Sequence, residues 1–161
     1  LAVVRIWVEI ATSVAAMPDL RLDLFRPDWE IREAAGAGAP GLVPDALVQV
    51  RGVGDDETEP IRFAVEADLG TERPPVIRRK LQGYRSLALG DGLFGWTDFG
   101  IAAYLPGATE ARRKRIEDLF AADWPGWFAV LGEGRDIAGF LREIASLPLR
   151  SPLRARGGEA P

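Results

Sequence analysis

The sequence of 161 residues contains no cysteine and no histidine. These absences exclude disulfides, Cys/His zinc sites, thiol nucleophiles and catalytic arrangements that depend on imidazole. Any chemistry must therefore use carboxylates, hydroxyls, lysine or arginine. No apolar run approaches the ~20 residues needed to cross a bilayer, and the first residues lack the charged start and cleavage site of a signal peptide. We therefore expect a cytoplasmic protein with no membrane partner.

Lysine is also scarce, because only Lys80 and Lys114 contribute to the 20 cationic residues and the rest are arginines. The formal net charge is −4, and taken alone it disfavours nucleic-acid binding, since affinity for phosphate comes largely from cationic side chains. The local distribution of charge therefore carries more information than its sum. A lysine in an unusual position is informative.

The composition is ordinary for a globular protein, with 47% hydrophobic and 27% charged residues. We expect one domain over residues 1–148 and a flexible tail over 149–161, which is rich in Arg, Gly and Pro. The chain begins with Leu1 and enters a helical pattern at once. This start predicts that an upstream part is missing from the chain.

Apolar periodicity predicts the order α-β-β-β-α-β-α-β-α, an α/β (α+β) fold with a mixed sheet flanked by helices. Helices are predicted over 1–17, from a cap at Thr71 to about Leu89, over 109–123 and over 136–147, and strands over 20–25, 42–51, 61–69, 99–105 and 127–131. Residues 32–41 are interpreted as a small-residue loop, and the five tryptophans as packing residues.

Two of the predicted strands, 42–51 and 61–69, form an antiparallel hairpin whose register follows from keeping one face apolar. The predicted pairs are Val50–Ile61, Val48–Phe63 and Ala46–Val65. The same register sets Asp45 opposite Glu66 on the other face, and Asp68 shares that face. Directly opposed carboxylates repel unless a cation or a proton holds them together.

Three converging carboxylates predict a site for Mg²⁺ or Mn²⁺, because these ions prefer oxygen ligands and keep places for water and phosphate. We expect Asp45, Glu66 and Asp68 to hold the metal. Lys80 falls on the apolar stripe of the helix that follows, together with Ile77, Leu81 and Tyr84, and so points inward. It is predicted to orient or deprotonate an attacking water.

Simpler interpretations of the same residues stay open. The acids also fit a solvated strand face, and Lys80 fits a side chain that reaches solvent or pairs with Glu66 or Asp68. Tyr84 is interpreted as packed core with a bonded hydroxyl, and Glu72 as a complement to the helix dipole. Glu9 is either a fourth ligand from the first helix or solvated.

A set of cationic residues is predicted to follow a phosphate backbone. These residues are Arg78, Arg79, Arg85, Arg112, Arg113, Lys114 and Arg115. The alternative for the run at 112–115 is an exposed helix face balanced by Glu110, Glu117 and Asp118.

Three motifs together resemble the replication-relaxation proteins of plasmids and related mobile elements. The motifs are "PDALV" at 44–48, "FAVEADLGTE" at 63–72 and "KLQGY" at 80–84, in that order. The resemblance extends from Leu1 to about Tyr84. It implies a role in plasmid DNA replication and relaxation, with DNA and replication proteins as partners. It also implies that the missing upstream part is a DNA-binding domain.

The same order and the Pro-Asp…Glu-x pattern are similar to the PD-(D/E)xK nuclease superfamily. That resemblance implies that residues 1–148 form a nuclease-like domain with a restriction-endonuclease-like core. It also implies that an acidic pair binds metal and that a lysine two positions after the second acid assists hydrolysis. Position 68 holds Asp where that pattern has Lys, and Lys80 is interpreted as a relocated replacement. Lys80 and Tyr84 also match the spacing of a Gln-x-x-x-Tyr pattern found in some of these nucleases. The alternative is a catalytically inactive module that keeps the fold and binds DNA or a replication partner.

Overall fold

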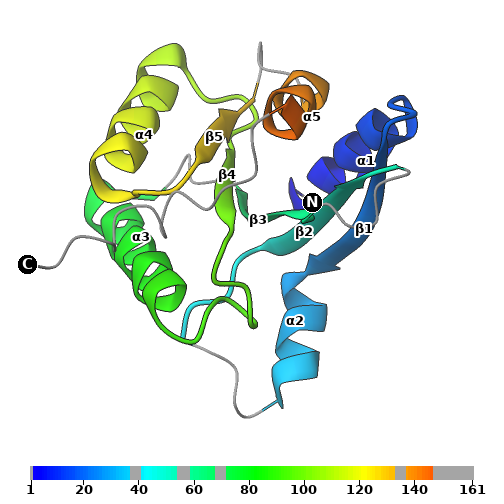
Figure 1. Ribbon diagram of the computed structural model, residues 1–161. Coiled ribbons are helices and arrows are strands. Elements are labelled where there is room, and N and C mark those ends of the chain that lie inside the picture. The colour runs from blue at the N-terminus through cyan, green and yellow to red at the C-terminus, as the bar shows by residue number, and fades with distance from the viewer. Residues whose placement is uncertain (1, 37–40, 54–58, 68–71, 133–136, 147–161) are drawn as a thin grey trace, which may run out of the picture.

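The computed structural model describes residues 2–36, 41–53, 59–67, 72–132 and 137–146, which form five strands and five helices (Figure 1). The strands are β1 (Leu20–Pro27), β2 (Ala46–Gly52), β3 (Ile61–Ala67), β4 (Gly100–Tyr104) and β5 (Phe128–Leu131). The helices are α1 (Ala2–Ala15), α2 (Asp28–Ala35), α3 (Pro74–Leu89), α4 (Glu110–Asp123) and α5 (Ile137–Ser146). The predicted mixed α/β fold is confirmed. The predicted tail over 149–161 lies outside the described residues.

The strands form one mixed sheet in the order β1-β2-β3-β4-β5. β1, β2 and β3 pair antiparallel, whereas β3, β4 and β5 pair parallel. The register predicted for β2 and β3 is confirmed, because Val50 pairs with Ile61, Val48 with Phe63 and Ala46 with Val65. β2 begins at Ala46, so the prediction of a strand from residue 42 was wrong for its first four residues.

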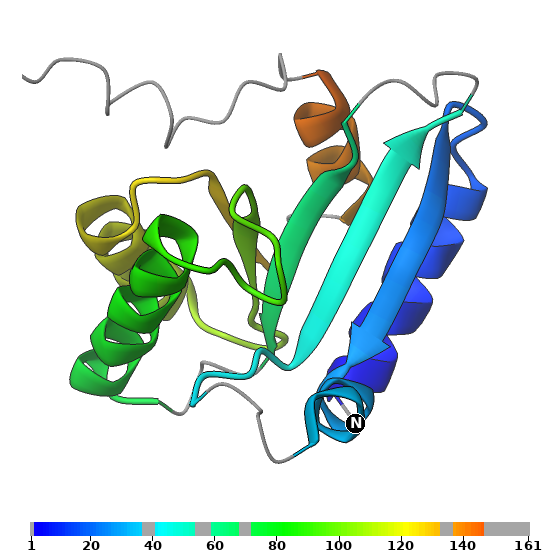
Figure 2. The same ribbon diagram turned by 60° about the horizontal axis from the view of Figure 1, so that its bottom comes forward.

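Two helical layers cover the sheet, α3 and α4 on one face and α1 and α5 on the other (Figures 1 and 2). Side chains alternate along each strand, so Leu47 and Ala64 join the cluster under α3 and α4, while Val48 and Phe63 join the cluster under α1 and α5. The connections from β3 to β4 and from β4 to β5 run through α3 and α4, as parallel pairing requires. Both helices therefore lie on the same face of the sheet, against β3, β4 and β5.

α2 is an element that the sequence prediction missed. Residues 32–35, predicted as part of a loop, belong to this helix, which begins directly after β1. Only Ile31 is buried among its residues, so the apolar stripe from which a helix is recognised is nearly absent. The backbone N–H of Asp28 donates to the carbonyl of Asp45 at 2.9 Å and ties the start of α2 to the start of β2.

The starts of α3 and α4 follow different rules. Thr109 caps α4 by accepting from the backbone N–H of Arg112 at 3.3 Å. α3 has Arg73 at its N-cap position without a side-chain cap, and Pro74 and Pro75 open its first turn. These prolines fit because the first helical N–H groups lack partners within the helix. The prediction that Thr71 caps this helix was therefore wrong about the boundary, and Thr71 itself lies outside the described residues.

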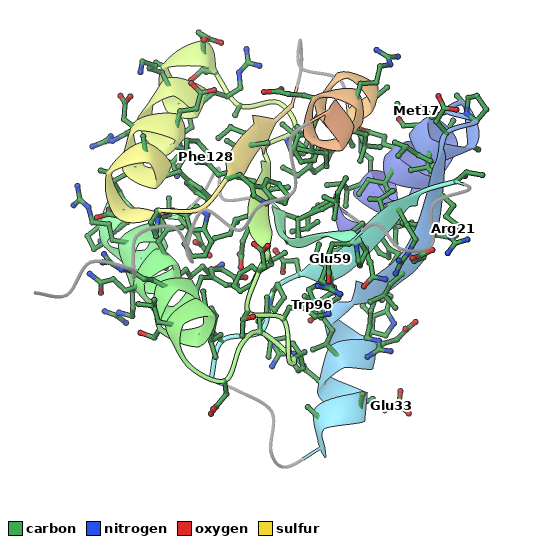
Figure 3. The ribbon with its side chains drawn as sticks, in the orientation of Figure 1. Met17, Arg21, Glu33, Glu59, Trp96 and Phe128 are labelled. Atoms are coloured by element: carbon green, nitrogen blue, oxygen red, sulfur yellow. The ribbon has the colours of Figure 1, made fainter. Side chains whose placement is uncertain are left out.

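The end of the sheet near the hairpin turn carries a network of charged side chains. Asp23 accepts hydrogen bonds from Arg21 at 2.8 Å and from Arg51 at 3.0 Å. Arg62 lies 3.6 Å from Glu59 and stacks 5.9 Å from the ring centre of Trp96, and Figure 3 labels both partners. Burial raises the pKa of Asp23, but its hydrogen bonds from Arg51, Arg21 and Gln49 outweigh this and lower the pKa overall.

Candidate active site

The candidate site lies where β3 ends, beneath the inward face of α3. Glu66, near the end of β3, is 2% exposed. It is the one charged residue that is buried among the residues that the structure describes. It follows Ala64 by two residues and therefore points to the face that α3 covers. A buried carboxylate is costly unless hydrogen bonds or an opposite charge compensate for the lost water.

Two side chains of α3 provide that compensation. The ammonium nitrogen of Lys80 lies 2.7 Å from Oε2 of Glu66, and the hydroxyl of Tyr84 donates a short hydrogen bond to Oε1. Lys80 and Tyr84 are four residues apart, which places them on one helix face. Tyr84 is fully buried and packs against Phe99 and Trp124. Both oxygens of Glu66 are thus held from α3.

Glu72 is the third partner of this network. Its Oε1 lies 2.8 Å from the Lys80 ammonium, so Lys80 bridges two carboxylates. Its Oε2 is buried and has no hydrogen-bond partner among the described residues. The guanidinium of Arg112, from the first turn of α4, donates to the backbone carbonyl of Glu72. The segment before α3 is therefore tied to both α3 and α4.

Asp45 approaches the same site from the start of β2. Its Oδ2 accepts from the backbone N–H of Ala67 at 2.7 Å, and its own N–H donates to the carbonyl of Val65 at 3.0 Å. Extending the observed β2–β3 register by one residue sets Asp45 opposite Glu66. The two acids are close enough for the charge of Asp45 to raise the pKa of Glu66.

The pKa values of both acids are raised, chiefly by burial. For Glu66, the attraction of Lys80 and the hydrogen bonds from Lys80 and Tyr84 only partly offset this effect on the pKa. For Asp45, the Ala67 hydrogen bond and Lys80 lower the pKa, while the charges of Asp28 and Glu72 raise it further. The site therefore favours binding of positive charge or protons.

Lys80 and Tyr84 are held in their protonated forms. Burial lowers the pKa of Lys80, but Glu66 and Glu72 together raise it to about 12. The pKa of Tyr84 lies well above its ordinary value because of burial and the adjacent charge of Glu66. In this arrangement Lys80 remains an ammonium at neutral pH, so it can neutralise or donate to an anion but cannot accept a proton from water.

Three of the four predicted catalytic residues, Asp45, Glu66 and Lys80, are brought together. Asp68 lies outside the described residues. Among the residues that the structure does describe, no three acidic side chains are grouped closely enough to hold a metal ion. The predicted ion pair of Lys80 with Glu66 and the bonded hydroxyl of buried Tyr84 are present.

Glu72 and Glu9 differ from what the sequence indicated. The helix-dipole interpretation of Glu72 missed its ion pair with Lys80, which depends on the path of the chain between β3 and α3. Glu9 accepts from the hydroxyl of Tyr104 at 2.7 Å and pairs with Arg5. Tyr104 belongs to the cluster under α1 and α5, so Glu9 lies on the opposite face of the sheet from Glu66.

The predicted DNA-binding cations divide into three groups. Arg113 pairs with Glu110 and Lys114 with Asp118, as the balanced-face alternative requires, while Arg78 lies 3.4 Å from Asp123. Arg112 faces inward to Glu72. The remaining three are exposed and have no ion pair in the described part of the chain: Arg79, Arg85 and Arg115.

Comparison with known proteins places the chain in a family. No curated protein matches it. None of the helices in the described ranges is long and apolar enough to cross a membrane. The model of the replication-relaxation family matches residues 1–95, more than half of the 161 residues and a range that includes Asp45, Glu66 and Lys80. The chain therefore belongs to the replication-relaxation family.

Proposed function

We propose that this protein processes DNA in plasmid or mobile-element replication, through a metal-dependent phosphodiesterase-like site. Asp45 and Glu66, together with Asp68, hold Mg²⁺ or Mn²⁺, and Lys80 serves the reaction. One observation carries this proposal: two carboxylates from adjacent strands meet under a helix whose lysine lies 2.7 Å from Glu66. Membership of the replication-relaxation family suggests the wider setting, with DNA or replication proteins as partners.

The order of the elements supports the nuclease-like interpretation. Apart from α2, the chain from α1 to β4 runs α-β-β-β-α-β, the order of the PD-(D/E)xK superfamily that the sequence resembles. Asp45 directly precedes the second strand, and Glu66 lies near the end of the third. These are the positions of the acidic pair in that resemblance.

The donor atoms suit a hard divalent cation. Mg²⁺ is commonly bound by one or two carboxylates and keeps several waters, so a complete cage of protein ligands is not required. Asp45 and Glu66 have raised pKa values, and Oε2 of Glu72 is buried without a hydrogen-bond partner among the described residues. A cation at this site would relieve the repulsion between the charges of Asp45 and Glu66.

Lys80 acts as a fixed positive charge in this proposal. Because its pKa is raised to about 12, it is suited to stabilising negative charge on a phosphate and not to deprotonating water. A bound divalent ion supplies the remaining chemistry by polarising a phosphoryl oxygen and lowering the pKa of a bound water. Tyr84 keeps Glu66 in position through its hydroxyl.

Metal-dependent melting and plasmid nicking test the proposal together. We expect millimolar Mg²⁺ or Mn²⁺ to raise the melting temperature, because a ligand that binds only the folded state stabilises it, and to support nicking of supercoiled plasmid. Asp45→Asn and Glu66→Gln should abolish both effects. Glu9→Gln, the same kind of change on the opposite sheet face, should preserve both. The proposal fails if neither metal shifts the melting temperature and no nicking occurs.

A second candidate is a non-catalytic module that binds DNA or a replication partner. Its specific support is that Lys80 already neutralises Glu66 and Glu72, while position 68 is Asp where the nuclease pattern has Lys. In this case the network stabilises the fold, and the exposed cations carry the function. The protein would then bind DNA without cleaving it in any divalent metal.

Salt-dependent DNA binding tests the second candidate directly, whereas metal-dependent cleavage separates the two. Replacing Arg79 and Arg85 by alanine should weaken DNA binding and reduce its salt dependence. The slope of the logarithm of the binding constant against the logarithm of the salt concentration should become shallower by about one for each lost phosphate contact. Arg113→Ala is the control, because Arg113 pairs with Glu110. DNA binding that is absent or insensitive to salt would argue against this module as a DNA binder.

A further inference from the structure

A pocket of about 310 Å³ opens at the junction of α1, β1 and α2. Its lining includes Val4, Trp7, Phe25, Pro27, Trp29 and Glu30. The rings of Trp7 and Phe25 lie 6.4 Å apart at a tilt of 54°. The pocket is thus walled mainly by aromatic and aliphatic side chains, with one carboxylate.

The surface around this pocket is unusually apolar for exposed residues. Trp7 is 46% exposed and Trp29 is 54% exposed, and neighbouring Val4 and Val8 on α1 are 49% and 50% exposed. Trp7, which packs against Phe25, and Trp29 therefore lie at the edge of the core and not inside it. Exposed tryptophans grouped around a concavity are typical of protein-binding surfaces.

The negative charge of α2 beside the pocket is only partly compensated within the helix. α2 carries Asp28, Glu30 and Glu33 against a single cation, Arg32, which lies 3.6 Å from Asp28. Glu30 lines the pocket and makes no hydrogen bond or ion pair within the described ranges. Glu33 lies on the outer side of the same helix (Figure 3).

We propose that this pocket binds a segment of a partner protein that presents a large apolar side chain next to a lysine or arginine. The apolar side chain would fill the pocket, and the cation would lie against the tryptophan rings and pair with Glu30. Tryptophan is the best aromatic partner for a cation, and a charge-assisted hydrogen bond to a carboxylate adds orientation.

Charge argues against the other occupants. Single-stranded nucleic acid stacks on exposed aromatic residues, but its phosphates would be repelled by the acids of α2. A second copy of the chain would bring the same excess of negative charge to the contact, because a two-fold interface uses one surface twice. A basic partner segment is the occupant that the surface complements.

The position of α2 also connects this surface with Asp45. The N–H of Asp28 donates to the carbonyl of Asp45 at 2.9 Å, so a partner on α2 is held next to the start of β2. The binding proposal does not depend on metal binding or catalysis by Asp45. Its failure and the failure of the proposed function are therefore separate outcomes.

Selection of peptides from a random library displayed on phage tests the proposal with the whole chain as target. We expect the enriched peptides to share a large apolar residue beside a lysine or arginine. A synthetic labelled copy should bind about tenfold more weakly to Trp29→Ser and to Glu30→Gln. Glu30→Lys should change the selected charge from basic to acidic. Leu89→Ser, at an exposed leucine of α3, should bind as the original protein does.

Other outcomes overturn the proposal. These are a library that yields no enriched sequence, peptides that bind Trp29→Ser unchanged, and peptides indifferent to Glu30. Light scattering that shows a dimer lost in Trp29→Ser would assign the surface to self-association, and loss of single-stranded DNA binding in that variant would assign it to nucleic acid. Melting curves check that each variant folds, and Val4→Ser changes the same pocket from α1 if Trp29→Ser does not fold.

Discussion

The ammonium of Lys80 lies 2.7 Å from Oε2 of Glu66 and thereby joins α3 to the end of β3 through a buried charge. Lys80 is itself 28% exposed, whereas the side chain of Glu66 is 3% exposed. The pair therefore spans the boundary between core and solvent. Its stability depends on both partners, because removing either leaves the other uncompensated.

Lys80→Met tests how strongly this ion pair stabilises the fold. We expect the free energy of unfolding to fall by about 3 kcal/mol at neutral pH, since Glu66 would keep a buried charge without its cation. Urea unfolding measures the change. Lys114→Met is the matched control, because Lys114 pairs with Asp118 on an exposed face. This substitution should leave the free energy of unfolding unchanged within experimental error. Equal effects of the two substitutions would contradict a buried ion pair.

Tyr84→Phe tests the second hydrogen bond to Glu66. The substitution removes only the hydroxyl, so we expect a loss of about 1.5–3 kcal/mol of unfolding free energy from the unsatisfied buried carboxylate oxygen. Tyr104→Phe is a close control, because Tyr104 also donates to a glutamate, the 38%-exposed side chain of Glu9. Chemical denaturation should show the larger loss for Tyr84→Phe. A larger loss for Tyr104→Phe would be inconsistent with the described geometry.

Tyrosinate formation tests both phenols at once, since the chain contains only two tyrosines. Burial and the Glu9 hydrogen bond raise the pKa of Tyr104 to about 12, and the pKa of Tyr84 lies well above its ordinary value. The folded protein should therefore show little tyrosinate absorbance at pH 10.0, where an unperturbed tyrosine is half ionised. In concentrated urea both should titrate near their ordinary value. If the titration curve of the folded protein coincided with the curve in urea, the raised pKa values of Tyr84 and Tyr104 would be refuted.

The pH dependence of stability tests the raised pKa of Glu66. A carboxyl whose pKa is higher in the folded than in the unfolded state binds protons preferentially when folded, so its cost falls as the pH drops toward 4.5, the ordinary value. Relative to Glu66→Gln, the original protein should gain unfolding free energy between neutral pH and pH 4.5. Asp23 has a lowered pKa, so its contribution to stability decreases as the pH falls. This contribution is the same in both proteins and cancels in the comparison. A loss of unfolding free energy relative to Glu66→Gln over the same pH range would exclude a raised pKa of Glu66.

Strand pairing was predictable because it follows from local alternation. In β2 and β3 the apolar residues alternate strictly enough to fix the register, and the register in turn places Asp45 opposite Glu66. The inward position of Lys80 followed from the helical stripe that it shares with Leu81 and Tyr84. These features depend on periodicity, which the sequence carries directly.

Features that depend on the path of the chain were not predictable in the same way. Glu72 reaches Lys80 because of how the segment before α3 is placed, and Tyr104 reaches Glu9 across 95 positions of sequence. α2 buries only Ile31, so it leaves no clear stripe. The apolar stripe of α1 was found, but periodicity did not show that Trp7 lies at its exposed edge.

The order β1-β2-β3-β4-β5 leaves β1 and β5 as the outer strands of the sheet. An outer strand offers unpaired backbone groups to which another chain can add, which is a route to aggregation. β5 offers only four residues, and β1 interrupts its regular geometry with a register shift between Leu22 and Leu24 while carrying Arg21 and Asp23. Both borders are thus poor templates for intermolecular strand addition, so concentrated solutions should resist fibril formation.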